Sequence, residues 1–331
     1  MSTPFRAYVV NKTDEGFTSG LRELTQADLP AGEVLIKVAY SSVNYKDGLA
    51  SIPNGRVVRS YPLVPGIDMS GVVVESSDPR FKPGDEVLAT SFDLGVSHSG
   101  GFSEYARVKA AWVVPLPEGL TLQEAMALGT AGFTAALAIH QLEKMGLKPQ
   151  NGPVLVTGAT GGLGSIAISI CKTLGYTIAA STGKESEHAY LKDLGAETVL
   201  SRQETSAESN RPLEKELWAG SVDTVGGSTL AYLLRTTKAW GSVASCGNTG
   251  GPNVSTTVFP FILRGVNLLG IDSAYCPMEL RRQIWEHLAS DYKPKSLLTT
   301  IAHEVPLDDL PQALATILKG GVRGRTIVKI D

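Results

Sequence analysis

The sequence is poor in the residues that bind metal ions and form disulfides. Only three cysteines and five histidines occur in 331 residues. The cysteines are widely spaced, which favours reduced, mostly structural thiols of the kind found in cytoplasmic proteins. The histidines form no close-spaced ligand motif, so no metal site is expected. The cysteines are Cys171, Cys246 and Cys276, and the histidines are His98, His140, His188, His287 and His303.

An excess of positive charge is also missing. The net charge is −3, which excludes a basic field for nucleic acid and a polybasic patch for membranes. No apolar run approaches the length of a membrane span, and the N-terminus MSTPFRAYVV lacks the charged-then-apolar layout of a secretory signal. The chain shows no tandem repeat and is long enough for two domains. We therefore expect a cytoplasmic protein with no nucleic-acid or membrane partner.

One stretch, residues 153–184, carries the clearest signal. A short apolar run at 154–157 predicts a buried strand, a helical pattern ends at Gly175, and 177–181 predicts a second strand. Strand, tight turn, helix and strand, with glycines at the turn, is the context of a dinucleotide fingerprint. Glycine lets the backbone approach a pyrophosphate, and the helix N-terminus offers free N–H groups. The turn contains Gly158, Gly161, Gly162 and Gly164.

The glycine pattern departs from G-x-G-x-x-G at its first position. Ala159 stands where the first glycine belongs, and Gly158, one residue earlier, is the alternative source of the turn. A glycine-rich turn without a ligand is the competing interpretation. The intact strand–turn–helix–strand context favours the dinucleotide site.

The end of the second strand predicts the choice of cofactor. An NAD site has an acidic residue here for the ribose hydroxyl, but residues 177–183 contain none. Ser181, Thr182, Gly183 and Lys184 instead offer hydroxyls and a cation, which suit a 2′-phosphate. Arg202, after a strand expected at 198–200, could join them. We therefore predict NADPH, with a solvated loop as the alternative for these residues.

The pattern of elements changes near residue 120. Before it, short strands at 33–43, 69–75, 86–90, 102–108 and 112–114 are separated by glycine and proline turns, which is typical of a β-barrel-like or partly open all-β domain. After it, Thr121 and Glu124 form a capping box, and strands alternate with helices. That alternation predicts an α/β domain with a doubly wound, Rossmann-type parallel sheet.

Motifs along the whole chain then point to one family. They are SVNYKD, PGIDMSG, KPGDEV, GTAGFTA, VTGATGGLG, VDTVGG, CGNTGG, PFILRGVNLLGIDS and GRTIVKI. From about Ala7 to Ile330 the chain resembles the zinc-free quinone oxidoreductase branch of the medium-chain dehydrogenases and reductases. Within that branch it is most similar to the subfamily of acrylyl-CoA reductases and quinone oxidoreductases.

The resemblance implies a split catalytic domain, mostly β and GroES-like, built from residues 1–125 and 275–331. An NADPH-binding Rossmann domain at 126–274 would lie between them in the chain. It also implies NADPH-dependent reduction of an activated C=C bond or a quinone, usually in a homodimer. The small-molecule electrophile is the partner that this chemistry requires.

The resemblance also assigns contacts residue by residue. The nicotinamide side would be lined by Asn248, where the family pattern has leucine, and by Ile262 and Ser273. Thr130 is a further candidate near the cofactor. The remaining cofactor contacts would be Tyr45, Thr160, Gly161, Gly162, Leu163, Thr182, Gly183, Lys184 and Arg202.

Zinc-dependent relatives carry cysteine where Asn44 stands and a His-Glu pair where Ile67 and Asp68 stand. A catalytic zinc needs three protein ligands, so we predict none here. Without a metal, the protein must offer hydrogen-bond donors to the developing oxyanion of a conjugated carbonyl. Tyr45 is the first candidate for this role or for proton delivery, and Asn44 the second; alternatively, Tyr45 only packs on the nicotinamide ribose. Asp68 could instead hold the loop at 44–47 by hydrogen bonds.

Three functions remain open from the sequence. The leading hypothesis is an NADPH-dependent reductase of enoyl thioesters or enones, with acrylyl-CoA the sharpest candidate. A quinone reductase is the alternative enzyme, and a non-catalytic NADPH-binding sensor or structural protein is the alternative of another class.

Arg264 has two possible roles in this sequence. It could reach an acidic part of the substrate or brace a dimer edge.

Overall fold

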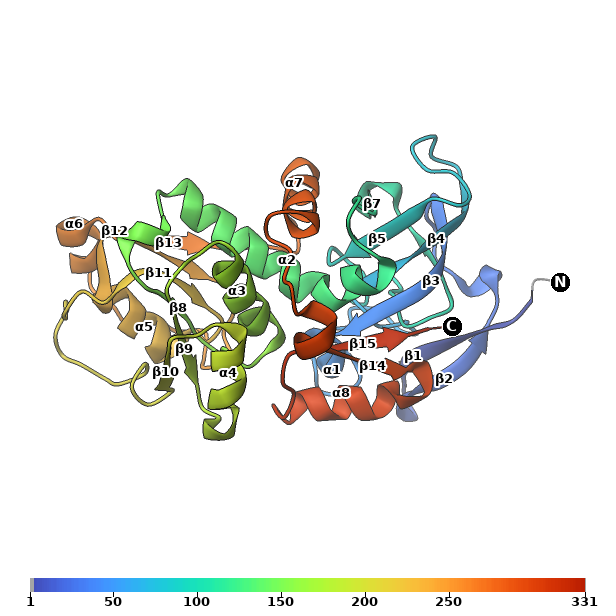
Figure 1. The fold of residues 1–331 in the computed structure, drawn as a ribbon. Coiled ribbons are helices and arrows are strands. Elements are labelled where there is room, and N and C mark those ends of the chain that lie inside the picture. The colour runs from blue at the N-terminus through green and yellow to red at the C-terminus, as the bar shows by residue number, and fades with distance from the viewer. Residues whose placement is uncertain (1–2, 331) are drawn as a thin grey trace. The chain divides into compact units, whose positions relative to one another are not determined.

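The computed structural model describes residues 3–330 and divides into two compact units (Figure 1). The first unit comprises the chain up to Thr130, Ala274–Gln283 and the chain from Leu297 on; the second comprises Ala131–Ser273 and Ile284–Ser296. The breaks after Thr130 and Ser273 lie five residues and one residue from the predicted ones, and residues 284–296 pack in the second unit instead of the first. The reason is Trp285, which is fully buried and stacks on Phe133 with ring centroids 6.0 Å apart.

The first unit is built on a seven-stranded sheet that joins both ends of the chain. Its order is β14-β15-β3-β4-β5-β7, with β6 paired to β3. The pairs are antiparallel except β14 with β15. A separate antiparallel hairpin holds β1 (Phe5–Thr13) and β2 (Gly16–Leu24). The sheet strands are β3 (Val34–Val43), β4 (Asp68–Ser76), β5 (Glu86–Thr90), β6 (Tyr105–Val108), β7 (Val113–Pro115), β14 (Ala302–Pro306) and β15 (Arg325–Lys329).

Apolar residues along β3 explain why this sheet forms. Val34, Ile36 and Val38 are fully buried in the main core, Leu35 is buried in a small cluster with Phe5 and Leu29, and Lys37 is exposed. After β3 the chain enters the short helix α1 (Tyr45–Ala50), against which α8 (Leu310–Leu318) packs. A Cβ at Gly48 would lie only 2.9 Å from the Ile317 side chain, so glycine permits this close packing.

The helix α2 (Leu122–Lys144) begins at the predicted capping box. The Glu124 N–H donates to Thr121 Oγ1 (3.1 Å), and the Thr121 N–H donates to Glu124 Oε2 (2.9 Å), which confirms that prediction. Gly129, at φ 52° and ψ −157°, interrupts the helix. Within the described residues α2 alone is long and apolar enough to cross a membrane, but 83% of its apolar window is buried. Its apolar side chains therefore serve the protein core.

The second unit holds a six-stranded parallel sheet of order β10-β9-β8-β11-β12-β13. Relabelled from β8, this is the order 3-2-1-4-5-6 of a Rossmann fold, which confirms the predicted doubly wound sheet. Figure 1 shows α3 and α4 beside β8–β10, and α5 beside β11 and β12. The strands are β8 (Val154–Val156), β9 (Ile178–Thr182), β10 (Thr198–Ser201), β11 (Trp218–Asp223), β12 (Thr237–Ser245) and β13 (Asn267–Gly270). The helices are α3 (Gly162–Thr173), α4 (His188–Leu194), α5 (Gly227–Thr236) and α6 (Phe259–Arg264); α7 (Met278–Ala289) begins in the first unit and ends in the second.

All three cysteines are free thiols, as predicted. Cys171 and Cys276 are buried, and burial raises the pKa of the Cys171 thiol to about 12. The pKa of the Cys246 thiol is raised as well, again chiefly by burial. Thiols in such surroundings stay protonated, so they serve packing and not nucleophilic chemistry.

Candidate active site

The turn between β8 and α3 shows which glycines the backbone requires. Gly158 has φ 57°, and a Cβ there would lie 2.1 Å from Thr224 Oγ1. A Cβ at Gly164 would lie 2.6 Å from the Gly158 carbonyl oxygen. Gly158 therefore makes the turn, which resolves the ambiguity left by Ala159, and Gly164 allows the helix to pack against the strand.

The N-terminus of α3 fits a bound phosphate group. The helix is 12 residues long and starts at Gly162, with Gly161 as an N-cap that offers no side chain. A Cβ at Gly161 would meet nothing nearer than the Gly158 oxygen at 3.4 Å, so its outer side is open. The first N–H groups of a helix lack partners within the helix and carry a partial positive charge. Thr160, Leu163 and the adjacent glycines therefore form a turn whose backbone N–H groups suit a pyrophosphate.

The next turn, after β11, is fixed by a carboxylate that the sequence did not reveal. Asp223 is fully buried, and it accepts hydrogen bonds from Thr157 Oγ1 (2.6 Å), Val225 N (3.1 Å) and Gly226 N (2.9 Å). Burial raises the pKa of Asp223, and the three donors oppose that shift. These bonds tie the end of β8 to the end of β11. The two turns flank the point where the strand order reverses, which is where such sheets bind nucleotides.

The predicted 2′-phosphate residues lie at the ends of β9 and β10. The Ser181 hydroxyl is buried and 2.6 Å from Thr205 Oγ1, and Thr182 Oγ1 accepts the Lys184 N–H at 3.0 Å. The Ser181 hydroxyl is thus engaged with Thr205, whereas the Thr182 hydroxyl accepts one hydrogen bond and can still donate its own hydrogen. The Arg202 N–H donates to the Thr182 carbonyl, and a Cβ at Gly183 would lie 3.3 Å from the Arg202 guanidinium carbon. The charge at this corner therefore comes from Lys184 and Arg202.

The residues assigned to the nicotinamide side are spread over three segments of the second unit. Ser273, after β13, accepts a hydrogen bond from Thr134 Oγ1 (2.8 Å). Asn248 is exposed in the loop after β12, and Ile262 on α6 is 67% exposed. Arg264 donates to the carbonyl of Arg235 (3.0 Å), which gives it a structural role inside this unit.

In the first unit, the segment carrying Tyr45 is held by a buried carboxylate. Asn44 is the N-cap of α1 and forms a capping box with Asp47. Its amide Nδ2 donates to Asp68 Oδ2 at 2.8 Å and to Asp47 Oδ2 at 3.2 Å. The prediction that Asp68 holds this loop is confirmed. Tyr45 itself is 51% exposed.

Asp68 shares its surroundings with Arg325, a residue that the sequence did not single out. Arg325 Nη2 lies 3.6 Å from Asp68 Oδ2 and donates to Ser42 Oγ at 2.7 Å, and Nη1 donates to Asn44 Oδ1 at 3.0 Å. Ser42 Oγ and the Thr130 N–H also donate to Asp68 Oδ2, at 2.7 and 2.9 Å. Asp68 is fully buried and Arg325 is 3% exposed. Strand β15, from the C-terminal end, thus supplies the cation for a loop near the N-terminus.

Gly129 completes this cluster from the break in α2. A Cβ at this position would lie 2.5–2.7 Å from Asp68 Oδ2, Arg325 Nη2 and Ser42 Oγ. With its positive φ, the position requires glycine. Thr130 follows directly, and its hydroxyl donates to Asp68 Oδ1. Thr130, predicted near the cofactor, is therefore first of all a partner of Asp68.

The residues at the expected zinc position contain no metal-ligand set. Ile67 is buried and apolar, and Asn44 bonds to Asp47, Asp68 and Arg325. Across residues 3–330, no group of three histidine, cysteine or acidic side chains could hold a metal ion.

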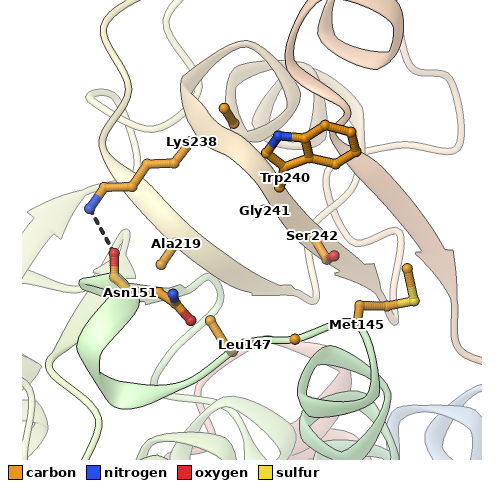
Figure 2. Close-up of a pocket in the computed structure, with 10 residues that line it drawn as sticks. Met145, Leu147, Asn151, Ala219, Lys238, Trp240, Gly241 and Ser242 are labelled. Carbon is orange, nitrogen blue, oxygen red and sulfur yellow. Dashed lines mark hydrogen bonds between the residues drawn. The ribbon is translucent and has the colours of Figure 1, made fainter.

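A pocket of about 220 Å³ lies elsewhere in the second unit (Figure 2). Its walls come from the start of β12, the start of β11 and the turn before β8, where Lys238 Nζ donates to the Asn151 carbonyl at 3.0 Å. These are the amino ends of the parallel strands. The glycine turn and the cation pair lie at the carboxyl ends, so this pocket is not the cofactor site. Its lining residues are Met145, Gly146, Leu147, Asn151, Ala219, Lys238, Ala239, Trp240, Gly241 and Ser242.

The chain matches two protein families and is similar to named oxidoreductases over nearly its whole length. The alcohol dehydrogenase GroES-like domain matches residues 30–118, and the zinc-binding dehydrogenase family matches residues 162–290. The chain is 54% identical over 330 residues to "Putative quinone oxidoreductase YhfP" of Bacillus subtilis, covering 100% of both. It is 51% identical over 329 residues to "Acrylyl-CoA reductase AcuI" of Ruegeria pomeroyi, covering 99% of both.

Solved structures agree with these matches. The yhdH oxidoreductase from Salmonella enterica, in complex with NADP, superposes with a TM-score of 0.95 at 48% identity; the match covers 98% of this chain and 100% of that one. The Bacillus subtilis yhfP structure, with NAD bound, gives a TM-score of 0.97 at 54% identity, with 99% and 100% covered. Relatives of the same fold have thus been seen with both nicotinamide cofactors.

Proposed function

Because the chain belongs to the zinc-free quinone oxidoreductase branch of the medium-chain dehydrogenases and reductases, we propose that it reduces the activated C=C bond of an enoyl thioester with NADPH. Acrylyl-CoA is the sharpest candidate substrate. The observation that carries the proposal is 51% identity over almost the whole length to a named acrylyl-CoA reductase. At that similarity the chain is an oxidoreductase. We propose the cytoplasm as its location.

NADPH fits the residues at the carboxyl edge of the Rossmann sheet. The open N-terminus of α3 would hold the pyrophosphate, and Lys184 and Arg202 would hold the 2′-phosphate. When bound, NADPH supplies the hydride. The further contacts we propose, all named above from the family resemblance or the sequence, are Tyr45, Thr130, Thr160, Gly161, Gly162, Leu163, Gly164, Ser181, Thr182, Gly183, Asn248, Ile262 and Ser273.

The protein must also stabilise the charge that develops on the substrate carbonyl. Tyr45 is the exposed donor on the held loop, and its hydroxyl would donate to the enolate oxygen or deliver a proton to the α-carbon. Asn44 was predicted as a second donor. Both hydrogens of its amide are already directed to Asp68 and Asp47, so we assign it to positioning Tyr45.

A quinone reductase is the second candidate, since the relative at 54% identity carries that name. The same hydride transfer would serve a quinone, whose carbonyl oxygen also gains charge. The sequence also left open a non-catalytic NADPH-binding sensor. That candidate is set aside, because relatives at 54% and 51% identity over nearly the whole chain are named oxidoreductases.

The deciding experiment follows NADPH oxidation at 340 nm with acrylyl-CoA, crotonyl-CoA, a small enone and 1,4-benzoquinone at equal concentrations. We expect turnover concentrated on acrylyl-CoA and unaffected by a chelator. Activity on the quinone alone would establish the second candidate. NADPH binding without turnover on any of these electrophiles would contradict both proposed reactions.

We also propose that the protein is a homodimer joined through the second unit. Strand β13 ends the sheet and has a neighbour on one side within the described residues. An apolar surface lies in the same part of the chain, with Val258 61%, Leu263 64% and Leu268 41% exposed. Pairing of two β13 edges about a two-fold axis would continue the sheet and cover this surface. A second copy is the partner that offers the same edge and the same apolar side chains.

Leu263→Asp is expected to convert the dimer to a monomer, because it places a charge in the proposed apolar interface. Analytical ultracentrifugation would measure the mass. Val74→Asp is the control, since Val74 is also an exposed apolar residue (41%) but lies in the first unit. An unchanged mass for Leu263→Asp, or an equal loss in both variants, would contradict this interface.

A further inference from the structure

The carboxylate of Asp47 is buried and surrounded by donors. Oδ2 accepts the Asn44 N–H at 2.8 Å and Asn44 Nδ2 at 3.2 Å, and Oδ1 accepts the Ile67 N–H at 2.9 Å. Each of these groups can only donate, so an ionised carboxylate satisfies all of them. A protonated carboxyl would direct its own O–H toward a donor and lose one of these bonds.

The charges around Asp47 come from two strands. Asp68 on β4 repels its charge, and Arg325 on β15 attracts it. Helix α8 packs on α1 and contains no titratable side chain. Burial first, and then Asp68, raises the pKa of Asp47 to about 7. Burial and the charge of Asp68 therefore favour protonation of this carboxyl at a higher pH than that of an exposed aspartate.

The bonds to Asp47 control where Tyr45 lies. Asn44 is the last extended residue before α1, and both its N–H and its amide are held by Asp47. Tyr45 is the next residue, and its side chain is exposed. A shift of Asn44 would therefore move Tyr45 directly.

We propose that Asp47 is a positioning residue whose ionised carboxylate fixes Asn44 and thereby Tyr45, and that protonation of Asp47 releases this segment. The inference rests on the proposed function, which assigns Tyr45 to the cofactor and substrate. The affinity for NADPH would then depend on the charge of Asp47 as well as on the charge of the 2′-phosphate of NADPH.

The test compares Asp47→Asn with the wild type, because the amide has the shape and the donor of a protonated carboxyl. The Kd for NADPH is measured by the fluorescence of the bound nicotinamide from pH 5.5 to 8.5. We expect equal values at pH 5.5 and about tenfold weaker binding by the variant at pH 8.5, as for one lost charge-assisted hydrogen bond. The titration of the cofactor phosphate affects both proteins and cancels in their ratio.

Two further variants show whether the effect acts through Tyr45. Asp28→Asn is the matched control: Asp28 closes a similar capping box, accepting the Thr25 N–H at 2.7 Å, but it is exposed. The ratio of the Kd of Asp28→Asn for NADPH to that of the wild type should not change with pH. In a protein that already carries Tyr45→Ala, Asp47→Asn should not weaken NADPH binding further. A ratio for Asp47→Asn that is independent of pH, or an effect that persists without Tyr45, would overturn the proposal.

Hydrogen exchange on the wild type covers the case in which Asp47→Asn fails to fold. Amides of residues 44–51 should lose protection between pH 8.5 and 6, after correction for chemical exchange, while those of residues 26–34 should not. Unchanged protection at 44–51 would overturn the proposal. Because neither readout requires turnover, an enzyme inactive on every electrophile would remove the proposed reaction and leave this test intact.

Discussion

Arg325→Met is expected to destabilise the first unit by about 3–5 kcal/mol, the range measured when one partner of a buried ion pair is removed. Arg325 is 3% exposed, and burial lowers its pKa while Asp68 and Asp47 raise it. Methionine fills much of the same volume but leaves both carboxylates in the interior without their cation. It also removes the donors to Ser42 and Asn44. Urea unfolding followed by circular dichroism would measure the change in stability.

Arg6→Met is the matched control for this prediction. Arg6 pairs with Asp308, likewise across most of the chain, but these side chains are 43% and 66% exposed. Exposed ion pairs contribute about 0–1 kcal/mol, so the same substitution should change stability little here. Adding Asp68→Asn to Arg325→Met should recover part of the loss, because it removes one buried charge. Equal, small effects of both arginine variants would show that the cluster does not depend on its cation.

The elements that the sequence predicted well are those with a local signal. The strand β3 is rich in apolar and β-branched residues over ten positions, and the glycine turn before α3 has its pattern within seven residues. In both cases the residues that define the element are neighbours in the chain. The capping box at Thr121 and Glu124 belongs to the same class.

Elements without such a signal were missed. The helices α1 and α6 have six residues each, which is too short for a period of 3.6 to show. Strand β14 has the sequence AHEVP, which contains a proline and is half exposed, and it forms because β15 lies beside it. The hairpin strand β2 carries glycine at two positions and little apolar alternation. In each case the element depends on packing against distant residues.

The residues of the site fall into the same two groups, those with a local sequence signal and those without one. The glycine turn before α3 could be predicted because its residues are consecutive, whereas Arg325 is separated from Asn44 by 281 positions. An arginine at the start of an apolar strand is the one signal that could have indicated a buried cation. Ser181 shows a different case, a predicted cofactor contact whose hydroxyl is also engaged inside the protein. Its residue type suits a phosphate, but it lies within the strand β9, and strand geometry directs it inward to Thr205.

The pair Lys184 and Arg202 carries the second large prediction. The double variant Lys184→Ala/Arg202→Ala is expected to lower the preference for NADPH over NADH by about a hundredfold to ten-thousandfold. Each charge-assisted hydrogen bond contributes roughly 1.5–3 kcal/mol, and the nearby Ser181 hydroxyl is already engaged with Thr205 within the protein. Kd values for both cofactors, from fluorescence titration at constant ionic strength, would give the preference.

The affinity for NADH separates this effect from damage to the fold. NADH lacks the 2′-phosphate, so its Kd should stay nearly unchanged in the double variant. Lys192→Ala/Arg211→Ala is the control, since it removes the same charges from exposed positions elsewhere in the second unit. A preference that survives in Lys184→Ala/Arg202→Ala would place the phosphate elsewhere. An equal loss for both cofactors would mean that these cations hold the loops after β9 and β10, and that the relative seen with NAD is the better guide to this pocket.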